Sequence, residues 1–126
     1  MSTIVSIKRE EQDGFDKAII KLSNDTYIVV GISAQELCCE DFGIDFNNGS
    51  APFIGSTVKY VRWAFGQEVS KYGDGHDDSA TVIIFTSVGN LAITCWNDHN
   101  GYYPHDVLAQ WDETDQYDGC NEIQTI

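Results

Sequence analysis

Short strand-like stretches separated by turn-forming residues are the feature that most constrains how this chain can fold. At the start of the chain, residues 3–8 alternate between apolar and polar, and similar stretches follow at residues 18–22 and 27–32. Asp13-Gly14 and Ser23-Asn24-Asp25 separate them. A repeat of two residues is typical of a half-buried strand, and Asn, Asp and Gly supply the backbone angles that tight hairpin turns need. The pattern predicts an antiparallel three-stranded meander.

The rest of the chain continues in the same way. Further strands are predicted at residues 37–46, 57–65, 81–87, 91–96 and 107–111. In the first of these, Phe42, Ile44 and Phe46 fall on one face. The third and fourth form a hairpin around Val88-Gly89-Asn90, and residues 66–79 are predicted to be a polar loop.

These patterns predict a mainly β protein of about eight strands, with an α+β protein as the alternative. Helix is limited to single turns, one at residues 33–36 and one beginning at Pro52. A chain of 126 residues has the size of one domain. We therefore expect a single β-rich domain over residues 1–126, folded as one curled antiparallel sheet or as a small β-sandwich, with an acidic segment at residues 112–126.

Charge is distributed very unevenly along the chain. The net charge is −13, and all seven Lys and Arg residues lie in residues 1–71, whereas residues 72–126 hold ten acids and no base. Such a surface repels phosphate backbones, which argues against direct binding to nucleic acid or to an anionic membrane. It attracts a basic protein surface instead. Acidity that only keeps the protein soluble is the alternative.

No targeting or membrane-spanning segment is evident in the sequence. A secretory signal needs an apolar run of about 7–15 residues, and a spanning helix needs about 18 or more. The chain contains neither, so we expect a soluble intracellular protein. In that setting the four cysteines are expected to be reduced, although their even number leaves a disulfide open. They are Cys38, Cys39, Cys95 and Cys120.

Thiol catalysis is weakly supported. Cys39, Glu40, His99 and His105 are residue types that a thiol enzyme uses. However, the strongly negative field raises the pKa of a thiol, where catalysis needs it lowered. The chain also has no nucleophile elbow, no phosphate-binding Gly-rich loop and no HExxH helix. We predict no catalytic residues and no enzymatic activity.

Metal binding is also weakly supported. Zinc ligands usually come in pairs two to four residues apart, whereas Cys38 and Cys39 are adjacent and would point to opposite faces of a strand. The acidic loop around Asp74, Asp77 and Asp78 lacks the register of a calcium loop. We therefore expect no metal and no cofactor, and keep a zinc-binding structural protein as an alternative.

The segment WNDHNGYYPHDV, residues 96–107, combines a turn with a possible contact surface. Asn100-Gly101 favours a tight turn, and the adjacent Tyr102 and Tyr103 point to opposite sides, so one can anchor the corner while the other faces a partner. Trp96 and Trp111, which flank the segment, are expected in the core.

Four short motifs occur in an order that resembles a known group of proteins. They are Leu37-Cys38-Cys39-Glu40, the Ile54-Gly55 turn, the hairpin from Thr86 to Gly89, and Asn100-Gly101-Tyr102-Tyr103. Over roughly residues 26–108 the chain resembles a family of small uncharacterised bacteriophage and prophage proteins. The resemblance implies a phage protein acting in the cytoplasm of a bacterial host, and it supplies no activity.

Resemblance and charge together favour an inhibitor of a host protein. Small acidic phage proteins often block restriction or CRISPR machinery, so we predict an anti-defence protein that mimics nucleic acid and occupies a basic, nucleic-acid-handling surface. The predicted partner-binding residues are Asp74, Asp77, Asp78, Asp98, Tyr102, Tyr103, Asp106, Asp112, Glu113, Asp115 and Asp118. The alternative is a small-ligand protein that holds a nucleotide or metabolite near Cys39, Glu40, Arg62 and Tyr102. Homo-oligomerisation is left open.

Overall fold

The computed structural model describes residues 2–34, 41–46, 49, 51–69, 76–99, 105–111, 117–118 and 123–126. At residues 41, 64–69, 76–78, 98–99, 117–118 and 123–125 it describes the backbone alone. Within these ranges the elements are β1 (Ile4–Gln12), β2 (Phe15–Leu22), β3 (Tyr27–Ser33), β4 (Asp41–Phe46), the 3-10 turn η1 (Ala51–Phe53), β5 (Val58–Val69), β6 (His76–Thr86), β7 (Gly89–His99), β8 (Asp106–Trp111), β9 (Tyr117–Asp118) and β10 (Ile123–Thr125).

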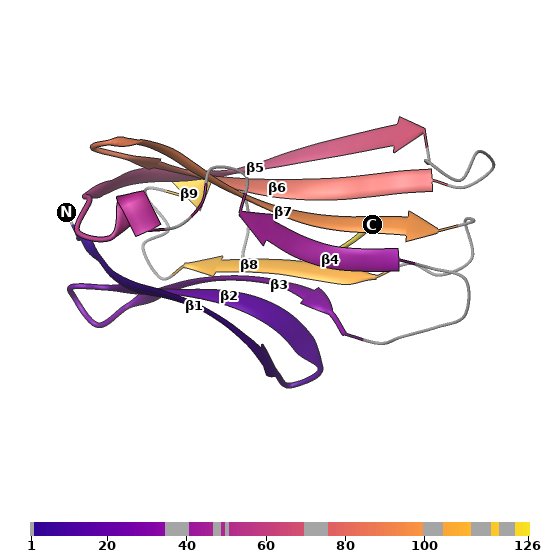
Figure 1. Cartoon of the computed structure of the whole chain (residues 1–126), viewed down its shortest axis with the longest axis horizontal. Coiled ribbons are helices and arrows are strands. Elements are labelled where there is room, and N and C mark those ends of the chain that lie inside the picture. Colours follow the sequence, from indigo (N-terminus) through magenta and orange to yellow (C-terminus); the bar gives the residue numbers. More distant parts are fainter. Residues whose placement is uncertain are drawn as a thin grey trace.

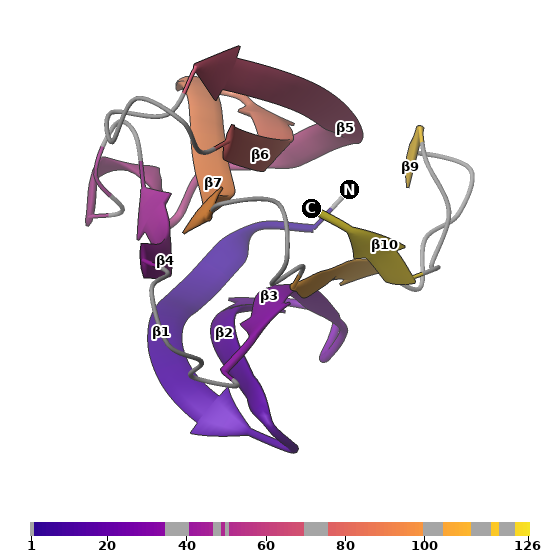
Figure 2. The ribbon, with the colours of Figure 1, turned by 90° about the vertical axis from the view of Figure 1, so that its right-hand side faces the viewer.

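The strands form two sheets packed face to face (Figure 1). The first sheet has the order β1-β2-β3-β8-β10, and the second has the order β4-β7-β6-β5-β9. All pairings are antiparallel except that of the two-residue strand β9, which runs parallel to β5. Figure 2 shows the edge strands β1 and β4 on the same side of the molecule. The prediction of a mainly β protein is confirmed, in its two-sheet form and without closure into a barrel.

The predicted N-terminal meander is confirmed. Asp13 and Gly14 both have positive φ, 55° and 78°, as a two-residue hairpin turn requires. At the second turn Asp25 has a φ of 63°, and the Asn24 side chain accepts hydrogen bonds from the backbone and hydroxyl of Thr26. Turn residues thus fix the register of this sheet locally.

Alternate residues of both sheets meet in one core. In β2, Ala18, Ile20 and Leu22 are fully buried, and in β7 every second residue of 91–97 is fully buried. Trp111 of β8 is the largest side chain in this core. Burying a large aliphatic side chain contributes roughly 1.5–3 kcal/mol, so these rows hold the two sheets together.

The predicted polar loop at residues 66–79 is wrong at residues 66–69 and 76–79, which are strand, while residues 70–75 lie outside the described residues. Strand β5 continues to Val69 and β6 already begins at His76, with backbone pairs that run from Val58 opposite Thr86 to Val69 opposite His76. Strand pairing depends on backbone hydrogen bonds, which polar side chains do not prevent. This end of the hairpin lacks the apolar pattern from which a strand is predicted, and so the sequence indicated a loop. The hairpin turn between β6 and β7 lies at Ser87 and Val88.

Three further predictions have mixed outcomes. The turn expected from Pro52 is present as η1, and Ser56 Oγ donates a hydrogen bond to the carbonyl of Phe53. The strand predicted at 37–46 is present as β4, but residues 35–40, and with them most of the expected helical turn at 33–36, lie outside the described residues. The acidic C-terminal segment contributes β9 and β10, one to each sheet.

Candidate functional site

Four acidic residues occupy one row across the second sheet. The backbone register sets Asp41 opposite Asp98, Asp98 opposite Asp77, and Asp77 opposite Glu68. We call these residues the acidic row. Directly opposite residues of an antiparallel pair share a face, with Cβ atoms about 4.5–5.5 Å apart, and like charges in such positions are destabilising. From this register we expect the row to lower the stability of the fold.

The register also determines the face on which this row lies. In β7, Cys95 and Asn97 are fully buried, while Trp96 between them is only half-buried. Alternation along a strand gives Asp98 the same parity as Trp96. The acidic row therefore belongs to the outward face of the second sheet.

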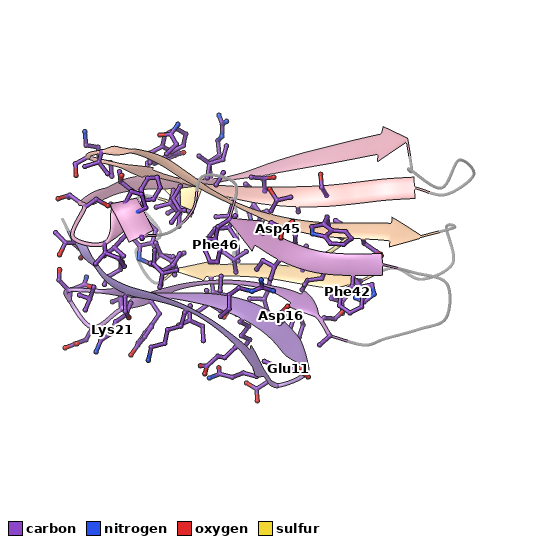
Figure 3. The ribbon with its side chains drawn as sticks, viewed as in Figure 1. Glu11, Asp16, Lys21, Phe42, Asp45 and Phe46 are labelled. Atoms are coloured by element: carbon purple, nitrogen blue, oxygen red, sulfur yellow. The ribbon has the colours of Figure 1, made fainter. Side chains whose placement is uncertain are left out.

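Trp96 of β7 lies on this outward face, next to the edge strand β4. Its Nε1 donates a hydrogen bond to Oδ2 of Asp45 at 3.0 Å, and Figure 3 shows Asp45 on β4. Gly43 lies opposite Trp96, and a Cβ at Gly43 would come within 2.9 Å of ring atom Cζ2. The indole can pack against β4 because residue 43 has no side chain. We call Trp96, Asp45 and the acidic row together the acidic face.

The expectation for the two tryptophans is half right. Trp111 is 1% exposed and lies in the core as predicted. Trp96 does not, because the inward positions of β7 are taken by its neighbours Cys95 and Asn97. Its large aromatic side chain led to the prediction that Trp96 is in the core. Alternation along β7 instead puts Trp96 on the outward face, because residues 95 and 97 point inward.

The structure brings together some of the predicted partner-binding residues. Asp77 and Asp98 are in the acidic row, whereas Asp78 lies opposite the buried Asn97 and therefore has the parity of the inward face. Asp106 is exposed but begins β8 of the first sheet, and Asp118 of β9 lies opposite Arg62 of β5. The others lie outside the described residues: Asp74, Tyr102, Tyr103, Asp112, Glu113 and Asp115.

Sequence reasoning missed four members of the acidic face: Asp41, Asp45, Glu68 and Trp96. Glu68 lay within the wrongly predicted loop, and Asp41 and Asp77 are far apart in the sequence. Only the strand register, which depends on pairing between distant segments, could have joined them.

The predicted ligand pocket is only partly described. Arg62 is exposed on β5, with its guanidinium carbon 5.9 Å from the centre of the Phe85 ring. It lies six residues from Glu68, which is about 20 Å along the strand and away from the acidic row. Cys39, Glu40 and Tyr102 lie outside the described residues, so their grouping with Arg62 stays a prediction.

Cys95 is a buried free thiol. Burial, with a smaller contribution from the negative charge of Asp16, raises the pKa of Cys95 to about 12. The thiol is therefore protonated at neutral pH and is a packing residue, not a nucleophile. Cys38, Cys39 and Cys120 lie outside the described residues.

His105 is buried between the sheets. Its Nδ1 lies 2.7 Å from the carbonyl oxygen of Ser33 and 2.9 Å from the Ser33 hydroxyl, and its ring centre is 4.1 Å from that of Phe42. These contacts tie the start of β8 to the end of β3. Where side chains are described, no three His, Cys, Asp or Glu residues are grouped as a metal site would require, and no described helix has the length and apolarity to cross a membrane.

Fold and site together define a two-sheet β protein with one strongly acidic outward face. The chain belongs to the family DUF7448, a domain of unknown function, and the match spans residues 2–109. The matched region includes β1 to β7 and most of β8, and so contains the whole acidic face. No curated protein and no solved structure matches the chain.

Proposed function

We propose that this protein binds a basic protein surface through its acidic face and blocks nucleic-acid binding there. In the form we favour, it is a phage-encoded anti-defence inhibitor that acts in the bacterial cytoplasm on a restriction or CRISPR protein. Its acidic face takes the place of a nucleic-acid backbone. The proposal requires no metal, cofactor or catalytic step.

The observation that carries the proposal is the acidic row. Three consecutive like-charge pairs, from Asp41 to Glu68, lower stability in the free protein. A cationic partner surface would relieve that repulsion on binding. A feature that costs stability when free and is neutralised when bound is expected of a binding surface.

Trp96 supplies an aromatic contact residue beside the acidic row. Tryptophan is among the residues most often found at energetic hot spots of interfaces. Here the indole is held by Asp45 and lies two residues from the acidic row. A partner Lys or Arg could therefore contact the ring face and carboxylates together. The net charge of −13 would speed the encounter with a basic partner.

The test is capture of a partner from bacterial lysate at about 50 mM salt, with elution up to about 500 mM. We expect the wild type to retain a basic nucleic-acid-binding protein, and duplex DNA to release it. The double variant Asp77→Lys/Asp98→Lys should lose the capture. The double variant Glu10→Lys/Glu11→Lys makes the same charge change on the first sheet and should retain it. Salt-insensitive capture, or capture that DNA cannot compete away, would show that the mimicry is wrong.

Two further variants show which part of the surface contacts the partner. Trp96→Ala should weaken binding by about 2 kcal/mol or more, which is roughly thirtyfold. Because it also removes the hydrogen bond to Asp45 and the packing on β4, binding is measured under conditions where urea unfolding shows the variant to be fully folded. Reversal of Asp112, Glu113, Asp115 and Asp118 to Lys should abolish binding if the C-terminal acids join the same surface. If only the C-terminal reversal mattered, the contact would lie in that segment and not on the acidic face.

A further inference from the structure

The outward face of the first sheet contains a groove of about 490 Å³ that the acidic face does not involve. It is lined by Ser6, Lys8, Glu10 and Gln12 of β1, Ile19 and Lys21 of β2, and Tyr27 and Val29 of β3. The inward positions of β2 are Ala18, Ile20 and Leu22, so the groove is on the solvent side of the sheet. Figure 3 shows Lys21 projecting from this sheet away from the second sheet.

The groove runs along the strands of the first sheet. Its β1 residues are every second position from Ser6 to Gln12, which corresponds to about 20 Å of extended strand. Lining groups therefore recur about every 6.7 Å along its length, the same repeat as the side chains on one face of an extended peptide. The shape matches a segment of about six residues in extended conformation.

One end of the groove is positively charged. Lys21 lies opposite Ser6, so Lys8 is its diagonal neighbour, about 7–8 Å away across the pair of strands. Among the described residues, one ion pair joins Arg9 to Asp16 and another joins Lys17 to Asp13. Neither Lys8 nor Lys21 takes part in an ion pair in that part of the chain. Two lysines without an ion pair in that part of the chain are notable in a protein of net charge −13.

The remaining lining combines apolar and polar groups. Ile19 and Val29 are half-buried and opposite each other, and Tyr27 is 44% exposed beside the lysines. At the other end Gln12 donates a hydrogen bond to Glu10. An alkyl chain would cover the polar groups of Ser6, Glu10 and Gln12 without offering them any hydrogen bond, whereas peptide groups can form further hydrogen bonds with them. Nucleic acid carries a negative charge at every nucleotide, so the net charge of −13 repels it more strongly than a short peptide with two carboxylates, which Lys8 and Lys21 can neutralise.

We propose that this groove binds an extended acidic peptide segment of a partner protein, with carboxylates against Lys8 and Lys21 and apolar side chains over Ile19 and Val29. This site is separate from the acidic face. It binds an acidic partner, whereas the acidic face binds a basic one. It is therefore independent of the function proposed above.

The test is a titration of ¹⁵N-labelled full-length protein, followed by amide chemical shifts, at about 50 mM salt. The probe is an acetylated and amidated hexapeptide with the order Asp-Thr-Asp-Thr-Val-Thr, in which both Asp side chains and the Val side chain lie on one face of the extended peptide. We expect shifts concentrated at residues 6–12, 19–21 and 27–29. The same peptide with Lys in place of Asp, and succinate alone, should give much weaker shifts. Succinate binding as tightly as the peptide would overturn the peptide site, as would shifts dispersed over both sheets.

The charge requirement has a matched control. Lys8→Glu/Lys21→Glu should weaken peptide binding at least tenfold, while Lys59→Glu/Arg62→Glu, which makes the same charge change at two exposed positions of β5 in the second sheet, should leave it nearly unchanged. If the double variant fails to fold, Lys21→Gln alone should weaken binding about threefold. Undiminished binding by a folded Lys21 variant would refute the proposal.

Discussion

The two sheets share a core but differ sharply on their outward faces. In the first sheet, Lys8 and Lys21 flank half-buried Ile19 and Val29 in a groove. In the second, the corresponding outward face carries the acidic row and Trp96. In both sheets the outward residues alternate along the strands with inward residues, and the inward residues of the two sheets are equally buried. Inward residues therefore specify the fold, and the outward ones are available for binding, with opposite charge on the two sides of one small protein.

The largest expected effect tests whether the core is shared. Ile20 of the first sheet and Ile84 of the second are both fully buried. Ile20→Ala and Ile84→Ala should each lower the free energy of unfolding by about 2–5 kcal/mol, because each leaves a cavity in the same core. Urea unfolding followed by tryptophan fluorescence and by circular dichroism measures this.

Both probes should report one transition for each variant. Two separate transitions, with each substitution affecting only one of them, would mean that the sheets are independent units. The acidic face and the lysine groove would then belong to two separate modules and not to the two sides of one core.

The next effect concerns Cys95, at the centre of β7. Its pKa is raised from 9.0 to about 12 in the folded protein, so the folded state holds the proton more tightly than the unfolded chain does. Its contribution to stability is fully present below pH 9 and is lost as pH rises toward 12, by up to about 4 kcal/mol. Urea unfolding at pH 8 to 11 should show wild type losing more stability than Cys95→Ala. Parallel pH profiles for the two proteins would contradict burial of this thiol.

A smaller effect is expected at Gly43, which lies under the Trp96 ring. Gly43→Ala places a Cβ 2.9 Å from that ring and should cost about 1–3 kcal/mol, or displace the indole from β4. Tryptophan fluorescence and the unfolding free energy together distinguish these results. Gly31→Ala in β3 is the control on the first sheet, because its closest side-chain contact, at 3.1 Å, is the flexible stem of Lys17. Equal effects at both positions would mean that the Trp96 contact has no special role.

How far the sequence predicts this protein depends on whether a feature is local. The Asp13-Gly14 turn was correctly predicted, because positive φ at two adjacent residues is encoded by those residues alone. The strands β2 and β3 were likewise predicted correctly, from the turn residues that bound them. The strand ends around Glu68 and Asp77 were not, because polar strands lack an apolar pattern and are stabilised by pairing with distant segments.

The candidate site was less predictable than the fold for the same reason. Asp77 and Asp98 were chosen from the sequence only as acids in an acidic half of the chain. Their position in one row with Asp41 follows from the register of three strands. The lysine groove combines β1, β2 and β3 in the same way. Charge composition predicted that the protein has an acidic surface, and pairing determined where it lies.

The smallest effect distinguishes the two faces most directly. Asp98 lies between two other acids, Asp41 and Asp77, whereas Glu10 of the first sheet lies opposite Lys17. Asp98→Asn and Glu10→Gln remove the same charge. The first should raise the free energy of unfolding by about 0.2–1 kcal/mol, because it removes repulsion from both neighbours. The second should lower it slightly or leave it unchanged, because it removes an attraction.

Salt dependence separates this pairing effect from the general effect of net charge. At about 1 M NaCl, where the Debye length is about 3 Å, the difference between the two variants should largely disappear. Urea unfolding at about 20 mM and 1 M NaCl measures it. If both variants gained equal stability at low salt, only the total charge would matter and the acidic row would have no local cost. The main support for its role in binding would then be lost, whereas the lysine groove would be unaffected, since it rests on a different sheet.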